Sequence, residues 1–244
     1  MRLDKFLVLK GYAPSREKAK TYIINGLISV NNKIITKPGC TINGDENITI
    51  KNNQFRWVSR SASKLEFALT HWNIDIKNKI CLDIGASTGG FSQVLLHYGA
   101  KIVYAIDVGH NQLATELQNI PNLIYYEGIN AKDISKNFFE HNIDFITVDI
   151  SFISITKIIH IIYDILIENG KAIILIKPQF EVGKKNLNKG IVKKNVNVKK
   201  ILNSIKEKFI KNYFKINGLI KSPIKGKNGN QEYLLYISKF NSKI

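Results

Sequence analysis

The feature that most constrains the fold of this chain is a glycine-rich stretch at residues 82–91, with the sequence LDIGASTGGF. An apolar run, 80–84, leads into it, and a run with helical periodicity, 91–98, leads out of it. This order predicts a buried strand, a tight turn and a helix. The glycines allow a sharp turn and let a ligand approach the backbone. Asp83 would stand where the strand ends, at the edge where open α/β sheets bind ligands.

The spacing of the acid and the glycines indicates the kind of ligand. It reads D-x-G-x-x-x-G-G, which differs from the G-x-G-x-x-G of dinucleotide-binding proteins and is the form in which enzymes that use S-adenosylmethionine present their first loop. The simpler alternative is an ordinary strand-to-helix turn in a doubly wound domain without this cofactor. If the cofactor binds, we expect six residues of the stretch to contact it: Asp83, Gly85, Ser87, Gly89, Gly90 and Phe91.

Segments with strand and helix patterns alternate around this loop. The predicted strands are 80–84, 102–106, 123–126, 145–148, 172–176, 214–220 and 232–237, and the predicted helices are 61–72, 91–98, 158–167 and 196–210. Such alternation predicts an α/β fold with a mostly parallel sheet. The last two strands flank a short glycine-rich segment, so we expect them to pair antiparallel. This departs from a plain dinucleotide-binding fold and fits the Rossmann-like sheet of S-adenosylmethionine-dependent methyltransferases. Glycine and lysine dominate 183–194, which predicts a mobile loop.

Residues 1–54 are predicted to form a separate small domain. Helical patterns at 2–9 and 16–25 precede short strand patterns at 27–30, 33–35 and 48–50. The polar and aromatic stretch 55–60 is the predicted linker, and 61–244 is the predicted methyltransferase domain. We expect Trp57, within this linker, to pack at the domain junction rather than stack on a base.

The composition restricts the class of protein. The 244 residues carry 36 Lys and Arg against 19 Asp and Glu, which gives a formal net charge of +17. A surface this basic favours a polyanion such as nucleic acid, although AT-rich coding, which enriches Lys, Asn and Ile, is an alternative origin of the charge. The sequence has no secretory signal and no apolar stretch of the roughly 20 residues that span a bilayer. Cys40 and Cys81 form neither a metal site nor a disulfide framework, so we expect a cytoplasmic protein without a structural metal.

Polar residues follow several predicted strands. Asp107 ends the second strand about 20 residues beyond the glycine loop, where an acid suits the ribose hydroxyls of an adenosine cofactor; a solvated acid is the alternative. Asn130 follows the third strand and is a further candidate for the cofactor site.

Four ionisable residues fall where the sheet can bring them together: Lys64, Asp149, Lys177 and Glu232. Two lysines and two carboxylates suit methyl transfer to a ribose hydroxyl, because this poor nucleophile must lose its proton as it attacks. A buried lysine beside another cation can accept that proton or stabilise the forming alkoxide. The alternatives are a helix-surface lysine at 64, an edge-strand acid at 232 and ordinary strand-end residues at 149 and 177.

The first 50 residues resemble the small RNA-binding domain named after ribosomal protein S4. The resemblance rests on the sequences RLD at 2–4, SREKAK at 15–20, INGLI at 24–28 and VN at 30–31. It implies that the second helix and the following turn present cations to structured RNA, which here are Arg16 and Lys20. Arg2 and Lys5 of the first helix are further candidates for RNA binding. A solvated helix face is the alternative for each of these cations.

Over nearly its full length the chain resembles the TlyA family, the haemolysin-A-like ribosomal RNA 2′-O-methyltransferases. The matching blocks include WVSR at 57–60, KL at 64–65, LDIGASTGGF at 82–91, AIDVG at 105–109, DISFIS at 149–154, IKPQFE at 176–181 and GNQEY at 229–233. The resemblance implies that Lys64, Asp149, Lys177 and Glu232 are catalytic and that Asp83, Gly85, Gly89 and Asp107 belong to the cofactor site.

The same resemblance implies a cytidine ribose in ribosomal RNA as the target, which we expect in the large subunit (23S); whether the small subunit (16S) is also a target is left open by the sequence. Two features depart from the family pattern: SAS at 61–63 replaces a more glycine-rich approach to Lys64, and Phe55 stands where some members carry an arginine. A non-catalytic ribosome-assembly factor and a membrane-active haemolysin are the two other functions to consider. The second would need an apolar or strongly amphipathic insertion segment, and none is evident.

Overall fold

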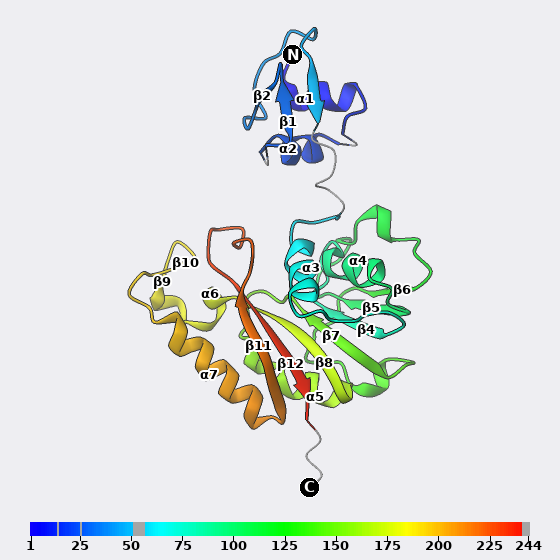
Figure 1. Cartoon of the computed structure of the whole chain (residues 1–244), viewed down its shortest axis with the longest axis vertical. Coiled ribbons are helices and arrows are strands. Elements are labelled where there is room, and N and C mark those ends of the chain that lie inside the picture. Colours follow the sequence, from blue (N-terminus) through cyan, green and yellow to red (C-terminus); the bar gives the residue numbers. More distant parts are fainter. Residues whose placement is uncertain (14, 25, 51–56, 241–244) are drawn as a thin grey trace. The chain divides into compact units, whose positions relative to one another are not determined.

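The computed structural model describes residues 1–13, 15–24, 26–50 and 57–240. The chain divides into two compact units, Met1–Arg56 and Trp57–Ile244 (Figure 1). The start of the predicted linker, including Phe55, lies outside the described residues. Trp57 belongs to the second unit, where its ring is buried and its indole nitrogen Nε1 donates to Glu66 Oε2 at 2.9 Å.

The first unit packs two helices against a small antiparallel sheet. Its elements are α1 Leu3–Leu9, α2 Arg16–Ile24, β1 Ile28–Val30, β2 Lys33–Ile34 and β3 Ile48–Ile50, with strand order β2-β1-β3. Leu3 and Leu7 stand one helical turn apart and are fully buried, together with Ile23 of α2 and Ile28 of β1. The predicted order of helices and strands is confirmed for this unit.

The second unit is built on a seven-stranded sheet. In chain order its strands are β4 Ile80–Ile84, β5 Ile102–Ile106, β6 Leu123–Tyr126, β7 Ile143–Val148, β8 Leu166–Ile176, β11 Phe214–Lys221 and β12 Tyr233–Lys239. They lie in the order β11-β12-β8-β7-β4-β5-β6. Neighbouring strands run parallel except at β12, which pairs antiparallel with both β8 and β11. The predicted parallel sheet with an antiparallel last pair is therefore confirmed.

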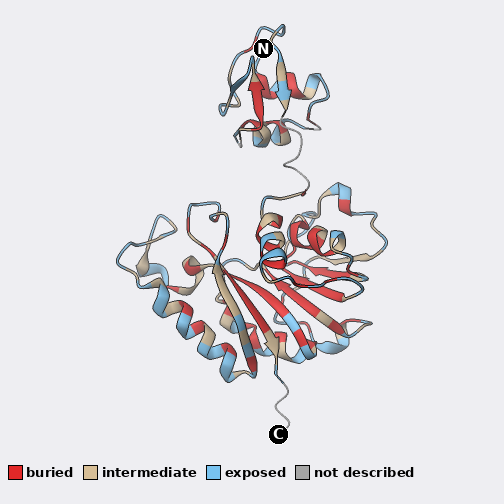
Figure 2. Ribbon diagram, viewed as in Figure 1, coloured by how far each residue is buried: buried red, intermediate tan, exposed pale blue. Residues whose placement is uncertain are grey.

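Helices cover both faces of this sheet because successive strand residues point to opposite sides. Cys81 of β4 faces α3 Ala62–His71 and α4 Gly90–His97. The next residue, Leu82, faces α5 Ile159–Ile165 and α7 Val198–Lys211. Figure 2 shows the central strands buried and the outer face of α7 exposed.

Three details differ from the sequence-based expectations. The predicted mobile loop at 183–194 instead contains a 3-10 turn, Lys184–Asn186, and a hairpin of β9 Leu187–Asn188 and β10 Ile191–Val192. The predicted helix 158–167 is shorter, because α5 ends at Ile165 and β8 begins at Leu166. A helix of four residues, α6 Pro178–Glu181, was not predicted, since one helical turn has too few residues to show periodicity. Short 3-10 turns also lie at Thr115–Leu117, Lys136–Phe138 and Ile155–Lys157.

Candidate active site

The glycine loop joins β4 to α4 and leaves backbone exposed to a cavity. Gly85 has φ +84°, and a Cβ there would lie 2.8 Å from the backbone oxygen of Asp149, so a side chain would clash. Gly89 has φ +87° and caps the N-terminus of α4. The loop needs glycine at 89 as well, because a Cβ there would meet the side chains of Leu117 and Leu113, although Gly89 itself does not line the cavity.

This cavity has a volume of about 980 Å³ and brings the loop together with the predicted catalytic residues. The cofactor-loop residues that line it are Gly85, Ala86, Ser87, Thr88 and Phe91, and all four predicted catalytic residues line it as well: Lys64, Asp149, Lys177 and Glu232. A cavity of this size, with the backbone of the glycine loop exposed in its wall, can hold an adenosine-containing cofactor together with part of a second substrate.

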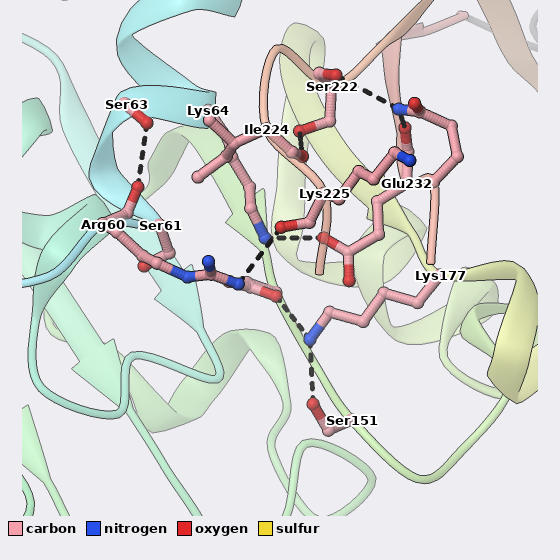
Figure 3. Close-up of polar contacts among 12 residues, drawn as sticks. Arg60, Ser61, Ser63, Lys64, Ser151, Lys177, Ser222, Ile224, Lys225 and Glu232 are labelled. Carbon is pink, nitrogen blue, oxygen red and sulfur yellow. Dashed lines mark hydrogen bonds and ion pairs between the residues drawn. The ribbon is translucent and has the colours of Figure 1, made fainter. Parts of the chain in front are cut away.

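Sheet topology explains why residues from distant parts of the sequence meet here. Asp149 follows β7 and Lys177 follows β8, so both stand at the carboxyl edge of the parallel strands. Glu232 directly precedes β12, whose antiparallel direction places its amino end at the same edge. Lys64 lies in the first turn of α3. The four residues thus converge from four separate parts of the fold, and Figure 3 shows three of them together: Lys64, Lys177 and Glu232.

The four side chains form two ion pairs with little exposure to solvent. Lys64 Nζ lies 2.6 Å from Glu232 Oε2, and these side chains are 7% and 3% exposed. Lys177 Nζ lies 2.7 Å from Asp149 Oδ1, and these side chains are 11% and 15% exposed. Burial raises the pKa of Asp149, while the nearby Lys177 and Lys64 partly offset this rise. A carboxyl whose pKa is shifted by burial and that faces a specific charged partner in a cavity is a candidate functional group.

Several residues around the pairs were not predicted as site residues. Lys177 Nζ also donates to Ser151 Oγ at 2.8 Å (Figure 3). Gln179 donates to Glu232 Oε1 at 3.3 Å, and its own carbonyl oxygen is buried without a hydrogen-bond donor among the described residues. Phe152 is 88% exposed with φ +69°, and its ring lies 5.3 Å from that of Phe180. Ser151 and Phe152 lie in the DISFIS segment, and Gln179 and Phe180 lie in the KPQFE segment. Their closeness in sequence to Asp149 and Lys177 could therefore have predicted that they belong to the site.

Asp83 does not line the cavity, although the sequence suggested contact with the cofactor. Its position in β4 directs it to the α3–α4 face, where it is fully buried and accepts hydrogen bonds from Ser92 Oγ at 2.6 Å and Thr147 Oγ1 at 2.8 Å. Burial raises its pKa to about 6. The structure therefore ties Asp83 to the framework of the glycine loop.

Asp107 and Asn130 are also absent from the cavity lining. Asp107 links two loops, because its carboxylate accepts the N–H of Ser87 and the N–H of Gly109, both at 2.8 Å. Asn130 is exposed, and its side-chain oxygen accepts the N–H of Lys132. Gly90 does not line the cavity either, and a Cβ at Gly90 would meet the hydroxyl of Ser59.

The predicted RNA-binding residues of the first unit have different surroundings. Arg2 and Arg16 each bind the fully buried Asp4, at 3.0 Å, while keeping about half of their side chains exposed. The hydrogen bond from Arg2 is the main reason that the pKa of Asp4 is strongly lowered. Lys5 is exposed, and Lys20 pairs with Glu17 at 2.7 Å on the helix surface. Arg2 and Arg16 are therefore held in place and still accessible to a polyanion.

Within the described ranges, no group of three or more His, Cys, Asp or Glu residues is arranged to hold a metal ion. The helices of the described chain also include none that is both long and apolar enough to cross a bilayer.

Comparison with known proteins agrees with this architecture. Residues 57–239 match the FtsJ-like methyltransferase family, and residues 1–48 match the S4 domain. Hemolysin A of Brachyspira hyodysenteriae is 45% identical over 97% of this chain and 99% of its own length. The 16S/23S rRNA (cytidine-2′-O)-methyltransferase TlyA of Mycobacterium tuberculosis is 34% identical over 97% of this chain and 89% of its own length. A solved hemolysin-type protein from Streptococcus thermophilus superposes with a TM-score of 0.78 at 36% identity, covering 99% of this chain and 89% of that one. The chain therefore belongs to the TlyA/haemolysin A family, in which an S4 domain precedes an FtsJ-like, S-adenosylmethionine-dependent methyltransferase domain.

Proposed function

We propose that this protein transfers a methyl group from S-adenosylmethionine to the ribose 2′-hydroxyl of a cytidine in ribosomal RNA. The observation that supports this most strongly is that two Lys–carboxylate ion pairs, Lys64–Glu232 and Lys177–Asp149, line the same cavity as the glycine loop. The curated relative of M. tuberculosis, which carries this activity in its name, supports the substrate.

The site residues have separate roles in this proposal. When bound, S-adenosylmethionine supplies an electrophilic methyl group on a sulfonium. The backbone at 85–88 would hold it, because glycine at 85 leaves the loop open to the cavity. We assign Lys177 to the 2′-oxygen of the substrate, with Asp149 and Ser151 fixing its Nζ. Lys64 and Glu232 form the second pair, and Gln179 orients Glu232 through its carboxylate.

The Lys177–Asp149 pair provides a route for the hydroxyl proton. As the new O–CH₃ bond forms and the S–CH₃ bond breaks, the 2′-oxygen must release its proton. Burial raises the pKa of Asp149, so its carboxylate accepts a proton more readily than an exposed carboxylate would. As the 2′-oxygen gives its proton to Lys177 Nζ, Nζ can pass one of its own protons to the paired carboxylate of Asp149, from which the proton reaches solvent after transfer.

The first unit is proposed to bind the RNA. Its fold is that of an S4 domain, and Arg2 and Arg16 present guanidinium groups whose orientation Asp4 fixes. Fixed guanidinium groups bind phosphate oxygens well, since less side-chain entropy is lost on binding. Lys5 and Lys20 would add charge, and the net charge of +17 favours the same partner.

We propose 23S ribosomal RNA as the main target and 16S ribosomal RNA as a second one. The partner of the protein is then a ribosomal subunit, and it acts in the cytoplasm. Cofactor binding to the purified protein and transfer of tritiated methyl groups to ribosomal RNA test the activity. Lys177→Ala should reduce transfer to background because it removes the group at the 2′-oxygen, while RNA binding by gel shift should be unchanged. Full transfer by Lys177→Ala would refute the assigned role.

A second candidate activity follows from the name of the relative Hemolysin A. A membrane-active protein would release dye from liposomes made of anionic and neutral lipid, and it would do so equally well as the Lys177→Ala variant. The methyltransferase proposal predicts no release by either protein.

A further inference from the structure

The Lys177–Asp149 pair is carried by two loops that follow neighbouring parallel strands. One loop, 149–155, follows β7, and the other, 177–181, follows β8. Because loops of this kind can shift independently, the 2.7 Å contact between Lys177 and Asp149 depends on what holds the two loops together.

Glu181, the last residue of α6, joins these loops directly. Its Oε2 accepts the hydroxyl of Ser154 at 2.6 Å, and its Oε1 accepts the N–H of Ile155 at 2.9 Å. Both contacts are hydrogen bonds to a carboxylate, which are shorter and stronger than bonds between neutral groups. The oxygen of Ser154 also accepts the N–H of Thr156 at 3.2 Å, so the same hydroxyl begins the 3-10 turn at 155–157.

The remaining contacts between the loops are less suited to hold them during the reaction. Two polar contacts begin at Lys177 Nζ, to Asp149 and Ser151, and these must adjust when Nζ binds the substrate oxygen. The rings of Phe152 and Phe180 also meet, but Phe152 is largely exposed and contributes no directional bond. The bonds of Glu181 use neither Lys177 nor Asp149, so they can persist throughout methyl transfer.

We infer that Glu181 is a positioning residue that fixes the distance between Lys177 and Asp149 by fastening the loop after β8 to the loop after β7. This inference rests on the proposed function, since it assigns Glu181 a part in the same reaction. It concerns the rate of the chemical step and not the binding of either substrate, because Glu181 does not line the cavity.

The test is the kinetics of Glu181→Ala in the full-length protein. We expect kcat to fall roughly 10- to 100-fold, in line with the effect of displacing a reacting group by about 1 Å. The KM for RNA and the dissociation constant for S-adenosylmethionine should change less than about twofold, because the glycine loop and the first unit keep their contacts. An unchanged kcat would overturn the inference, and so would a loss that appears only in KM.

Two further variants separate positioning from general loss of structure. Glu181→Gln should recover most of kcat, because its amide can accept the N–H of Ile155 and donate to the oxygen of Ser154. Ser154→Ala should lower kcat less than Glu181→Ala, and the double variant should be no worse than Glu181→Ala alone, since both changes break the same link. Glu207→Ala, an exposed glutamate on α7, is the matched control and should behave as the wild type.

These outcomes are distinguishable from failure of the proposed function. If the wild-type protein transfers no methyl group to ribosomal RNA, the function is wrong. If the wild type is active and Glu181→Ala keeps its kcat, or if Glu181→Gln is as impaired as Glu181→Ala, the function stands and only the positioning role is wrong.

Discussion

Replacement of Asp83 by asparagine should change how the stability of the second unit depends on pH. Asp83 is fully buried at the end of β4, and burial raises its pKa from an ordinary 3.8 to about 6. Since the folded protein holds this proton more tightly than the unfolded chain, the stabilisation is complete below pH ~4 and is lost as the pH rises to about 6. Two pKa units correspond to about 3 kcal/mol, which is the loss expected from this group alone.

Asparagine is nearly isosteric and does not titrate. Its single side-chain oxygen can accept one of the bonds that Asp83 accepts from Ser92 and Thr147, and either hydroxyl can rotate to accept from the new amide. Asp83→Asn should therefore gain stability relative to the wild type as the pH rises, by about 3 kcal/mol between pH 4 and pH 7.

Urea unfolding followed by tryptophan fluorescence measures this difference. Both tryptophans of the chain, Trp57 and Trp72, lie in the second unit, so the signal reports on the unit that contains Asp83. Asp164→Asn, at an exposed position of α5, provides the control and should follow the wild type at every pH. If the free energies of unfolding of Asp83→Asn and the wild type change in parallel between pH 4 and pH 7, the pKa of Asp83 is not raised in the folded protein.

Two further predictions concern the other buried charges. Lys64→Met leaves Glu232 buried without its ammonium partner, so the free energy of unfolding should fall by about 3–5 kcal/mol. The double variant with Glu232→Gln should recover part of that loss in the same urea assay, and a wild-type midpoint for the single variant would contradict this. Asp4→Asn should weaken the ion pairs with Arg2 and Arg16 and destabilise the first unit by about 1.5–3 kcal/mol, seen as faster hydrogen exchange in α1 and α2. It should also weaken RNA binding, and unchanged exchange and affinity would show that Asp4 does not hold these arginines.

The sequence predicted that the four proposed catalytic residues converge, because their convergence depends on the positions of strand ends. Asp149 and Lys177 each follow an apolar run, and parallel neighbours must share their carboxyl edge. Glu232 could be placed at the same edge once the last strand was expected to run antiparallel. Lys64 was harder to place, because the helical pattern shows only that it lies off the apolar stripe. The pattern does not show that its side chain is 7% exposed and pairs with Glu232, 168 residues further along the chain.

Other features depend on contacts that sequence patterns do not record. The inward direction of Asp83 follows from the alternation along β4, but its partners Ser92 and Thr147 come from two other elements. The β9–β10 hairpin has strands of only two residues and is held by the side chain of Asn230, which bonds the backbone of Gly190 and of Val192. Short elements fixed by single side chains carry too little periodicity to be predicted.

Nucleoside analysis of ribosomal RNA, after incubation with the purified protein and labelled S-adenosylmethionine, tests the proposed methyl transfer at the level of the modified atom. The label should be recovered as 2′-O-methylcytidine from the wild type, and Lys177→Ala should yield none. Label on a base instead of a ribose, or the same yield of 2′-O-methylcytidine from Lys177→Ala, would show that the proposed reaction or the role of Lys177 is wrong.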